Sequence, residues 1–346
     1  MPKFETAAPL WGTFVSKRFY AIAGRRLSVE ADAAWAGRFA QDFVSGLYLS
    51  PCAAPDEGPA DLRLAVSSAA AVAAPPLPAG LQKFDVPGGV CRSDGRRYFL
   101  DVCGSRVAVA GPESRLVSVW FGREASSERG ERARLTAMAY AVPAALRRLG
   151  LYDLHAACLV EPESGAGFVF PGASGSGKTS LSIRLAAAGW RYLSDDMLAV
   201  AECEGGVEVL PLRQPFQADD AALAGCRLPR IEEALGVRIP NDPDKRKLNP
   251  HVLFPGRFAA RALPRVLCFP AVAGEGRSRV EPLGQAEAMT RLVRMCPWAS
   301  YDAASARPHL RLLARLARQC RTYTLRAGRD IFDDASAAAR LLAPLV

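Results

Sequence analysis

The sequence has little lysine, few histidines and no long apolar run. Six of its 44 basic residues are lysine, so arginine carries nearly all of the positive charge. No stretch approaches the ~20 consecutive apolar residues that a membrane helix needs. The first residues, Met1–Glu5, also lack the apolar core of a signal peptide. We therefore expect no membrane partner and no secretory leader, and we expect a cytoplasmic protein.

The nine cysteines form no CxxC pair and show no zinc-like spacing. Several of them, such as Cys158 and Cys268, lie inside apolar runs. This pattern favours buried, reduced thiols over a disulfide framework or a structural metal site.

The net charge of +9 does not by itself indicate a partner. The arginines are scattered through alanine-rich helical stretches and form no dense basic block. Binding to nucleic acid would rest on net charge alone, so we expect none. The chain is 50% hydrophobic and 23% charged over 346 residues, which is typical of a globular protein with one large domain or two.

The pattern of strand and helix signals divides the chain near residue 125. The first part, residues 1–125, has a helical pattern and several short strand candidates separated by turn residues, which predicts a small α+β module rich in antiparallel sheet. The second part, residues 126–346, opens with a helical pattern that ends at Gly150 and continues as alternating strands and helices. These candidates are a helix at 34–47, strands at 97–102, 106–109 and 116–121, and a helix at 132–149.

Residues 172–179 match the phosphate-binding pattern GxxxxGK[ST] in full, with a strand candidate before them and a helical pattern after. Glycines let several backbone amides turn inward, and the helix adds the positive end of its dipole. Lys178 would meet the β- and γ-phosphates of ATP, and the Thr179 hydroxyl would ligate Mg²⁺. The alternative is a glycine-rich turn that binds nothing. The expected binding residues are Gly172, Ala173, Ser174, Gly175, Ser176, Gly177, Lys178, Thr179 and Ser180.

Asp195 and Asp196 follow the next strand candidate, at residues 190–194. A helix over 179–188 would be roughly 15 Å long, and five strand residues cover about 16 Å in the opposite direction. The chain therefore returns to the phosphate end if this strand lies beside the strand that precedes the loop. Adjacent strand residues point to opposite sides, so one aspartate would hold Mg²⁺ and the other would take a proton from an attacking hydroxyl. The alternative is a solvated acidic turn.

Around these motifs the chain resembles the kinase domain of bacterial HPr kinase/phosphorylase, whose fold is related to that of phosphoenolpyruvate carboxykinase. The resemblance covers about residues 130–330 and is specific only over 150–200. It implies an α/β P-loop kinase domain behind the smaller N-terminal module. The matching segments are Leu154–Ala156, the loop itself, Ala188–Arg191 and Leu193–Asp196.

The resemblance also implies roles for single residues. His155 would be an active-site residue, Asp196 the general base, and Asp195 a support for metal or base. The chain departs from the family where Leu212–Phe216 replaces a Glu-containing signature segment. It thus resembles divergent HPr-kinase-related proteins, some of which phosphorylate peptides or free serine. HPr kinases are hexamers, which leaves a homo-oligomer open.

A polar, proline-containing stretch at 240–251 contains Lys245 and Arg246. We expect a loop there, which either contacts the phosphates or is an exposed turn. Arg213 is a further candidate for phosphate contact.

The motifs favour a kinase that transfers the γ-phosphate of Mg·ATP to a hydroxyl, with serine expected, of a protein, peptide or small molecule. The alternative is a nucleotide-dependent regulatory ATPase or switch without phosphotransfer. Carboxykinase chemistry would need further metal ligands that the sequence does not offer.

Overall fold

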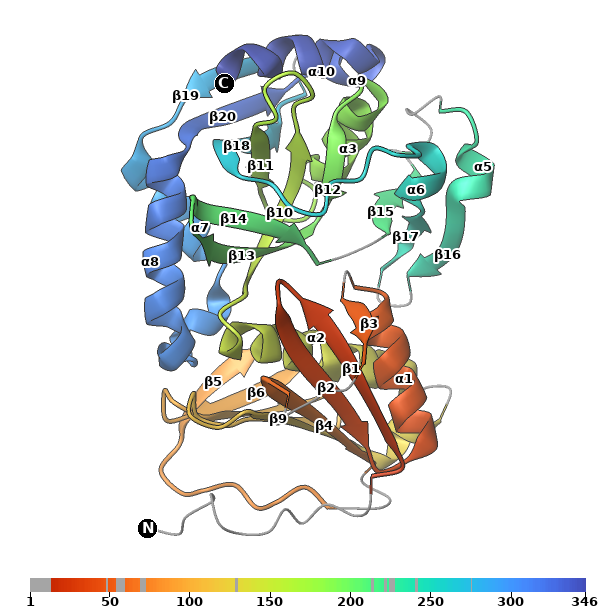
Figure 1. Cartoon of the computed structure of the whole chain (residues 1–346), viewed down its shortest axis with the longest axis vertical. Coiled ribbons are helices and arrows are strands. Elements are labelled where there is room, and N and C mark those ends of the chain that lie inside the picture. The colour runs from red at the N-terminus through yellow and green to blue at the C-terminus, as the bar shows by residue number, and fades with distance from the viewer. Residues whose placement is uncertain are drawn as a thin grey trace. The chain divides into compact units, whose positions relative to one another are not determined.

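The computed structural model is a mixed α/β protein with two large mixed sheets (Figure 1). It forms two compact units, one within residues 1–150 together with 298–306, the other within residues 151–297 and 307–346. No helix in the part of the chain that the structure describes is long and apolar enough to cross a membrane. The described residues are 14–47, 49–53, 60–68, 73–127, 130–212, 215–220, 223, 228–239, 242–274 and 276–346.

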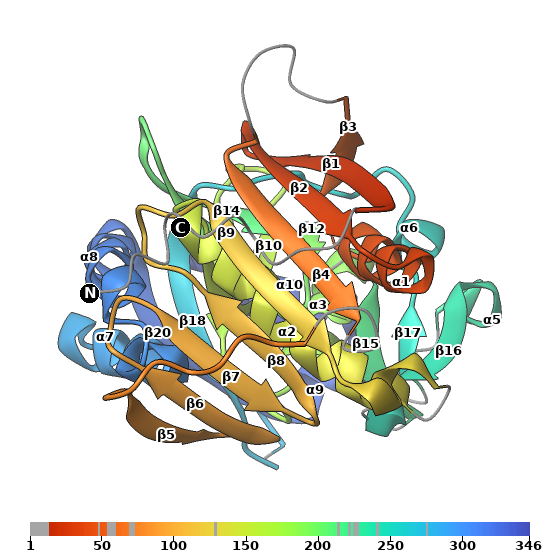
Figure 2. The same cartoon turned by 90° about the horizontal axis from the view of Figure 1, so that it is seen from below.

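The first unit is built on a nine-stranded sheet in the order β3-β1-β2-β4-β9-β8-β7-β6-β5 (Figure 2). The pairs β2–β4 and β4–β9 are parallel and the others are antiparallel. The three strands predicted between residues 97 and 121 are β7, β8 and β9, whereas the hairpin of β5 and β6 was not predicted. The strands are β1 (Ser16–Ile22), β2 (Arg25–Ala31), β3 (Ser50–Cys52), β4 (Leu62–Ser68), β5 (Gln82–Val86), β6 (Gly89–Ser93), β7 (Tyr98–Val102), β8 (Ser105–Val109) and β9 (Leu116–Phe121).

Helices α1 (Ala34–Ser45) and α2 (Glu131–Arg148) pack on this sheet, α1 against β2 and β4, and α2 against β4, β8 and β9. The sequence-based boundary at residue 125 assigned α2 to the second domain, and the contacts correct this. The apolar side chains of α2, among them Met138 and Val142, are buried within the first unit. The chain leaves this unit at Gly150, whose φ of +76° suits a glycine beyond a helix end.

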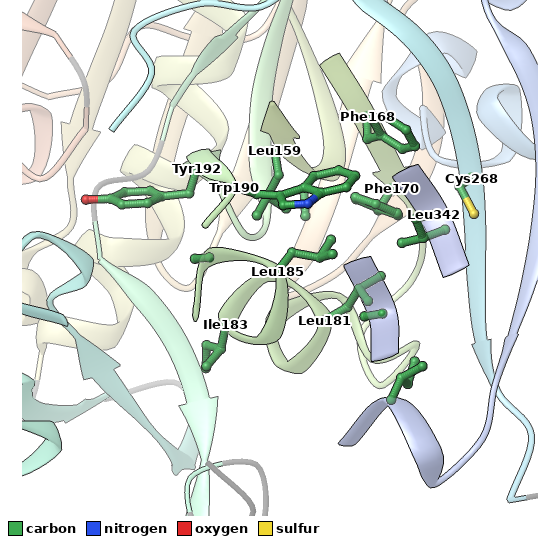
Figure 3. Packing of buried hydrophobic residues seen from close by; sticks show 14 of the residues in the cluster. Leu159, Phe168, Phe170, Leu181, Ile183, Leu185, Trp190, Tyr192, Cys268 and Leu342 are labelled. Atoms are coloured by element: carbon green, nitrogen blue, oxygen red, sulfur yellow. The ribbon is translucent and has the colours of Figure 1, made fainter. Parts of the chain in front are cut away.

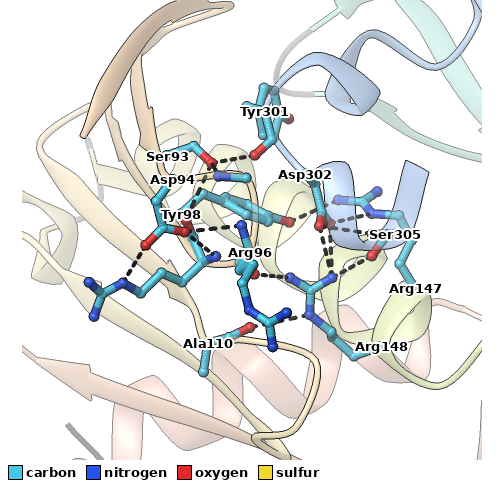
Figure 4. A network of polar contacts seen from close by, with 12 residues as sticks. Ser93, Asp94, Arg96, Tyr98, Ala110, Arg147, Arg148, Tyr301, Asp302 and Ser305 are labelled. Carbon is cyan, nitrogen blue, oxygen red and sulfur yellow. Dashed lines mark hydrogen bonds and ion pairs between the residues drawn. The ribbon is translucent and has the colours of Figure 1, made fainter. Parts of the chain in front are cut away.

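Residues 298–306 return to the first unit and are held to α2 by buried charges (Figure 4). Asp302 has no exposed surface, and its Oδ1 and Oδ2 accept hydrogen bonds from Arg148 at 2.9 and 3.1 Å. The Arg147 side chain lies 3.7 Å from the same carboxylate, and its guanidinium lies 4.2 Å from the ring centre of Trp298. Because loss of one partner would leave a buried charge uncompensated, this network ties the segment to the unit.

The second unit contains an eight-stranded sheet in the order β14-β13-β10-β11-β18-β20-β19, with β12 paired to β10 as well. Strands β11, β18 and β20 are parallel, so their carboxyl ends lie at one edge of the sheet. Every residue of β11 is buried, which explains its continuous apolar run. The strands are β10 (Tyr152–Val160), β11 (Gly167–Pro171), β12 (Arg191–Ser194), β13 (Met197–Cys203), β14 (Gly206–Pro211), β18 (Pro264–Val272), β19 (Arg279–Pro282) and β20 (Arg321–Ala327).

The core of this unit lies between the sheet and α3 (Lys178–Ala187), with α9 (Asp330–Asp333) and α10 (Ala335–Leu342) beside α3 (Figure 3). Trp190 is almost fully buried, and its ring centre lies 4.7 Å from that of Phe168. On β20, the side chain of Leu325 points into this core and that of Thr324 points to the opposite face of the sheet. Thr324 accepts a hydrogen bond from Arg291 of α7 (Gln285–Arg294), so α7 lies on that opposite face. Helix α8 spans Ala303–Gln319.

Helix α3 ends at the glycine that the sequence indicated. Gly189 has a φ of +107° and donates its N–H to Ala186 O, while Trp190 donates its N–H to Leu185 O. These two bonds form a Schellman motif, which satisfies carbonyls at the helix end. The motif turns the chain back toward β12 and places Trp190 in the core.

A three-stranded antiparallel sheet of β15 (Phe216–Asp219), β17 (Asp242–Leu248) and β16 (Leu235–Ile239) completes the unit, with the short helices α5 (Ile231–Ala234) and α6 (Pro250–Leu253). The sequence predicted a loop where β17 lies. The charged side chains of β17 give no strand pattern in the sequence. The strand forms through backbone pairing with β15 and β16 and through burial of Leu248.

Candidate functional site

The glycine-rich loop, residues 172–177, joins β11 to the first turn of α3. Gly175 and Gly177 have φ angles of +81° and +91°, which L side chains rarely adopt. A Cβ at Gly172 would lie 2.4 Å from Ser176 Oγ, so a side chain there would require Ser176 to move. Ser176 Oγ is buried and has no hydrogen-bond partner among the described residues. The conformation of the loop thus favours glycine at Gly175 and Gly177, and the Ser176 hydroxyl could bind a ligand.

Lys178 is the first residue of α3, and 5% of its side chain is exposed. Its Nζ donates to Gly172 O at 2.8 Å and to Ala173 O at 2.9 Å. The same Nζ lies 3.9 Å from Asp196 Oδ1. The ammonium group is therefore held inside the loop, within reach of one of the two adjacent aspartates.

The other aspartate, Asp195, is fully buried and lies against the start of α3. Its Oδ2 accepts a hydrogen bond from Thr179 Oγ1 at 2.8 Å and one from the Gln217 amide at 3.1 Å. The amide belongs to β15, so the three-stranded sheet helps to orient this carboxylate. The sequence did not reveal Gln217, because a backbone amide leaves no signal in the residue type.

Asp196 points toward a different partner. It lies where β12 ends and β13 begins, opposite β10, and its Oδ1 lies 2.5 Å from His155 Nε2. The loop is tied to the same place, since Gly172 donates its N–H to His155 O at 3.3 Å. Both side chains are partly exposed, His155 by 34% and Asp196 by 23%. The two acids therefore have separate environments, one buried and one open.

The path of the returning strand differs from the expected one. The expected return to the loop was conditional on the strand after α3 lying beside the strand before the loop. In the structure β12 pairs with β10, and β10 lies between β12 and β11. The aspartates still lie at the loop, because β11 and β12 are both antiparallel to β10 and so end at the same edge. The inserted strand brings His155 between the loop and the acids.

Strand β17 brings one basic side chain, that of Lys245, to the glycine-rich loop. Lys245 Nζ lies 3.3 Å from Ser174 Oγ. Arg246 is half-buried, and its Nε has no hydrogen-bond partner among the residues that the structure describes. Ser180 lies half-buried in the first turn of α3, and Arg213 lies outside the described residues.

The cysteines around the site are poor candidates for a nucleophile. Cys158 lies on β10, and burial raises the pKa of its thiol. Burial also raises the pKa of the Cys268 thiol, on β18, to about 12. Both thiols therefore stay protonated at neutral pH. All described cysteines are free, as predicted, but not all are buried: Cys103 is exposed, and Cys52 and Cys203 are half-buried.

The comparisons with known proteins found little. No family model and no curated protein matches the chain. Among solved structures, the one titled "Structure of the Hpr(Ser) kinase/phosphatase from Coxiella burnetii" matches with 14% identity and a TM-score of 0.22. The match covers 38% of this chain and 72% of that one. At this TM-score the likeness is too weak to establish a shared fold.

The arrangement combines a cation, a hydroxyl, two carboxylates and an imidazole at one helix N-terminus. Backbone amides and the helix dipole favour an anion at such a position. Asp196 is partly exposed, whereas the buried Asp195 accepts a hydrogen bond from the Thr179 hydroxyl.

Proposed function

We propose that the second unit binds Mg·ATP at the glycine-rich loop and transfers the γ-phosphate to a hydroxyl group of an acceptor. One observation carries the proposal. The carboxylate of Asp196 lies within 2.5 Å of His155 Nε2 and 3.9 Å of Lys178 Nζ, at the N-terminus of the helix that follows the loop. A base beside a phosphate-binding cation is what phosphoryl transfer to a hydroxyl requires.

The residues at the loop fit a nucleoside triphosphate and Mg²⁺. The loop has conformations that only glycine adopts easily, and the buried Ser176 Oγ is available as a donor. Thr179 and Asp195 would hold the metal, directly or through water, because Mg²⁺ is commonly bound by one or two protein oxygens together with substrate phosphates. Bound there, the metal would neutralise charge that develops on the phosphate oxygens.

Each side chain then has a defined task. Lys178 would exchange its carbonyl partners for phosphate oxygens, and Lys245 and Arg246 would add positive charge from β17. Asp196 would take the proton of the acceptor hydroxyl as that oxygen bonds to the γ-phosphorus. The bond from the γ-phosphorus to the bridging oxygen breaks, and ADP leaves with that oxygen. His155 would orient the Asp196 carboxylate and share its proton.

The acceptor would be the hydroxyl of a serine in a protein, in a peptide or as the free amino acid. This choice rests on the motif resemblance described for residues 150–200. The finer assignment as a divergent HPr-kinase-like enzyme rests on the same motifs.

Transfer of label from γ-labelled ATP tests the proposal. Wild type and Lys178→Ala would be incubated with Mg²⁺ and with fractions of a lysate of the source organism that contain proteins, peptides or small molecules. We expect label in one fraction with wild type only. Label released solely as free phosphate would contradict phosphotransfer and would favour a regulatory ATPase, in which Asp196 positions water.

A further inference from the structure

Val272 is an apolar side chain exposed at the edge of the sheet where the glycine-rich loop lies. It is the last residue of β18, and 56% of its surface is exposed, although Leu267 and Cys268 earlier in the strand are fully buried. Strand alternation sets Val272 on the same face as Val266 and Cys268, the face that packs on α3. An exposed β-branched side chain at this position has no role in the core.

Val272 lies directly against the start of α3. A Cβ built on Gly177 would be 3.3 Å from Val272 Cγ2. Strand β10 carries His155, and β12 ends just before Asp195 and Asp196. The strand order puts both of these strands on one side of β11 and puts β18 on the other side. His155 and Asp196 therefore lie on one flank of the loop and Val272 lies on the opposite flank.

This arrangement gives a bound nucleotide a direction. The proposed transfer requires the γ-phosphate at the flank with Asp196, next to Lys178. A triphosphate chain that starts there and follows the helix N-terminus carries the nucleoside toward the opposite flank, where β18 ends. An exposed apolar side chain there would favour binding of the nucleoside, because contact removes apolar surface of both from water.

The backbone around Val272 is braced against the next strand and helix. Ala273 donates its N–H to Ala327 O at 3.0 Å. Further along the turn, the Asp330 carboxylate accepts hydrogen bonds from Ser278 N at 3.0 Å and from Ser278 Oγ at 2.5 Å, and Ser278 Oγ accepts one from Gly328 N. These bonds keep the end of β18 in place, so Val272 stays at the surface and does not fold into the core.

We propose that Val272 contacts the nucleoside part of the bound nucleotide. This contact would make the site prefer a nucleotide over bare polyphosphate. The inference rests on the proposed function, since it needs a triphosphate at the glycine-rich loop. The nucleoside would contact an apolar side chain that offers no hydrogen bond, so we expect Val272 to give no preference between adenine and guanine.

The test compares Mg·ATP with Mg·tripolyphosphate by isothermal titration calorimetry of the full chain. Val272→Ala removes two methyl groups and should weaken ATP binding about three- to tenfold, with tripolyphosphate binding unchanged. Val272→Thr keeps the shape and should lose less. Val293→Ala, at another exposed valine of the same unit, is the matched control and should change neither affinity.

Two results would overturn the inference while the proposed function stands. Unchanged ATP affinity in Val272→Ala would show that the side chain does not contact the nucleoside. An equal loss for both ligands would show that Val272 acts on the loop through Gly177. In either case Lys178→Ala should still lose both ligands. If wild type binds neither ligand, the proposed function itself fails, and the inference fails with it.

Discussion

His155 Nε2 lies 2.5 Å from Asp196 Oδ1, although 41 positions separate the two residues in the chain. The glycine-rich loop and α3 lie between them in sequence, and the pairing of β10 with β12 and β13 brings them together. Such a short contact between imidazole and carboxylate fixes the orientation of both groups. In the mechanism that we propose, Asp196 is the base that takes the proton of the acceptor hydroxyl.

Asp196→Asn should lower kcat for phosphotransfer by about 10²–10⁴, because the amide cannot take the hydroxyl proton. Nucleotide affinity should remain within about threefold of wild type, since Asp196 makes no contact with the loop amides in this scheme. Single-turnover transfer and ATP titration measure the two quantities. Asp220→Asn, which changes an exposed carboxylate, is the control. Transfer at a near wild-type rate would remove Asp196 as the base.

His155→Ala should reduce kcat with little change in KM, because the imidazole orients the base and does not bind ATP in our proposal. In an Asp196→Asn background the same change should add little further loss, since residues that act as one unit are not additive. A double-mutant cycle of kcat measures this coupling. Fully additive effects would mean that the two residues act independently.

Thr179→Val should weaken Mg²⁺-dependent ATP binding about tenfold or more, because it removes the hydroxyl that donates to Asp195 Oδ2. Thr179→Ser keeps the hydroxyl and should retain most of the affinity. Titration of ATP at several Mg²⁺ concentrations separates metal from phosphate effects. If the valine variant keeps the metal dependence of wild type, Thr179 does not hold the ion.

Glu161 should make folding sensitive to acid. Desolvation raises the pKa of its carboxyl, but hydrogen bonds from Ser164 and the Glu163 amide outweigh this and hold the pKa below 4.5. A lowered folded pKa stabilises the protein above pH ~4.5, and this contribution is lost as the pH falls through the folded value. Glu161→Gln should therefore be less stable than wild type at pH 7, and this deficit should be smaller at pH 3.

Denaturant unfolding at the two pH values measures this difference. Glu163→Gln alters a nearby carboxyl for which the described part of the chain shows no side-chain hydrogen bond, and it is the control. A wild-type advantage that grows on acidification would contradict the assignment.

Asp302→Ala should destabilise the first unit by about 3–5 kcal/mol, because Arg147 and Arg148 would keep their charges in a buried site without the carboxylate. Glu287→Gln removes one partner of the exposed ion pair with Arg291 and should cost less than about 1 kcal/mol. Free energies of unfolding from urea titrations compare the two variants. Equal, small effects would show that segment 298–306 is held mainly by its apolar contacts.

The local features of the candidate site followed from the sequence alone. The glycine spacing from Gly172 to Gly177 indicated a loop between a strand and a helix, and Gly189 indicated where that helix ends. Both depend on backbone conformations that few residues other than glycine adopt, so a short segment carries the information. The strand at 167–170 was also predictable, because burial on both faces demands an uninterrupted apolar run.

Only the tertiary structure decided which distant elements meet. The insertion of β10 between β11 and β12, the pairing of β17 that brings Lys245 to Ser174, and the packing of α2 within the first unit each depend on contacts between segments far apart in the chain. Strand order and register are set by the summed burial of whole faces, and a charged strand such as β17 carries no apolar pattern of its own. The sequence thus determined the residue types at the site, and packing determined their neighbours.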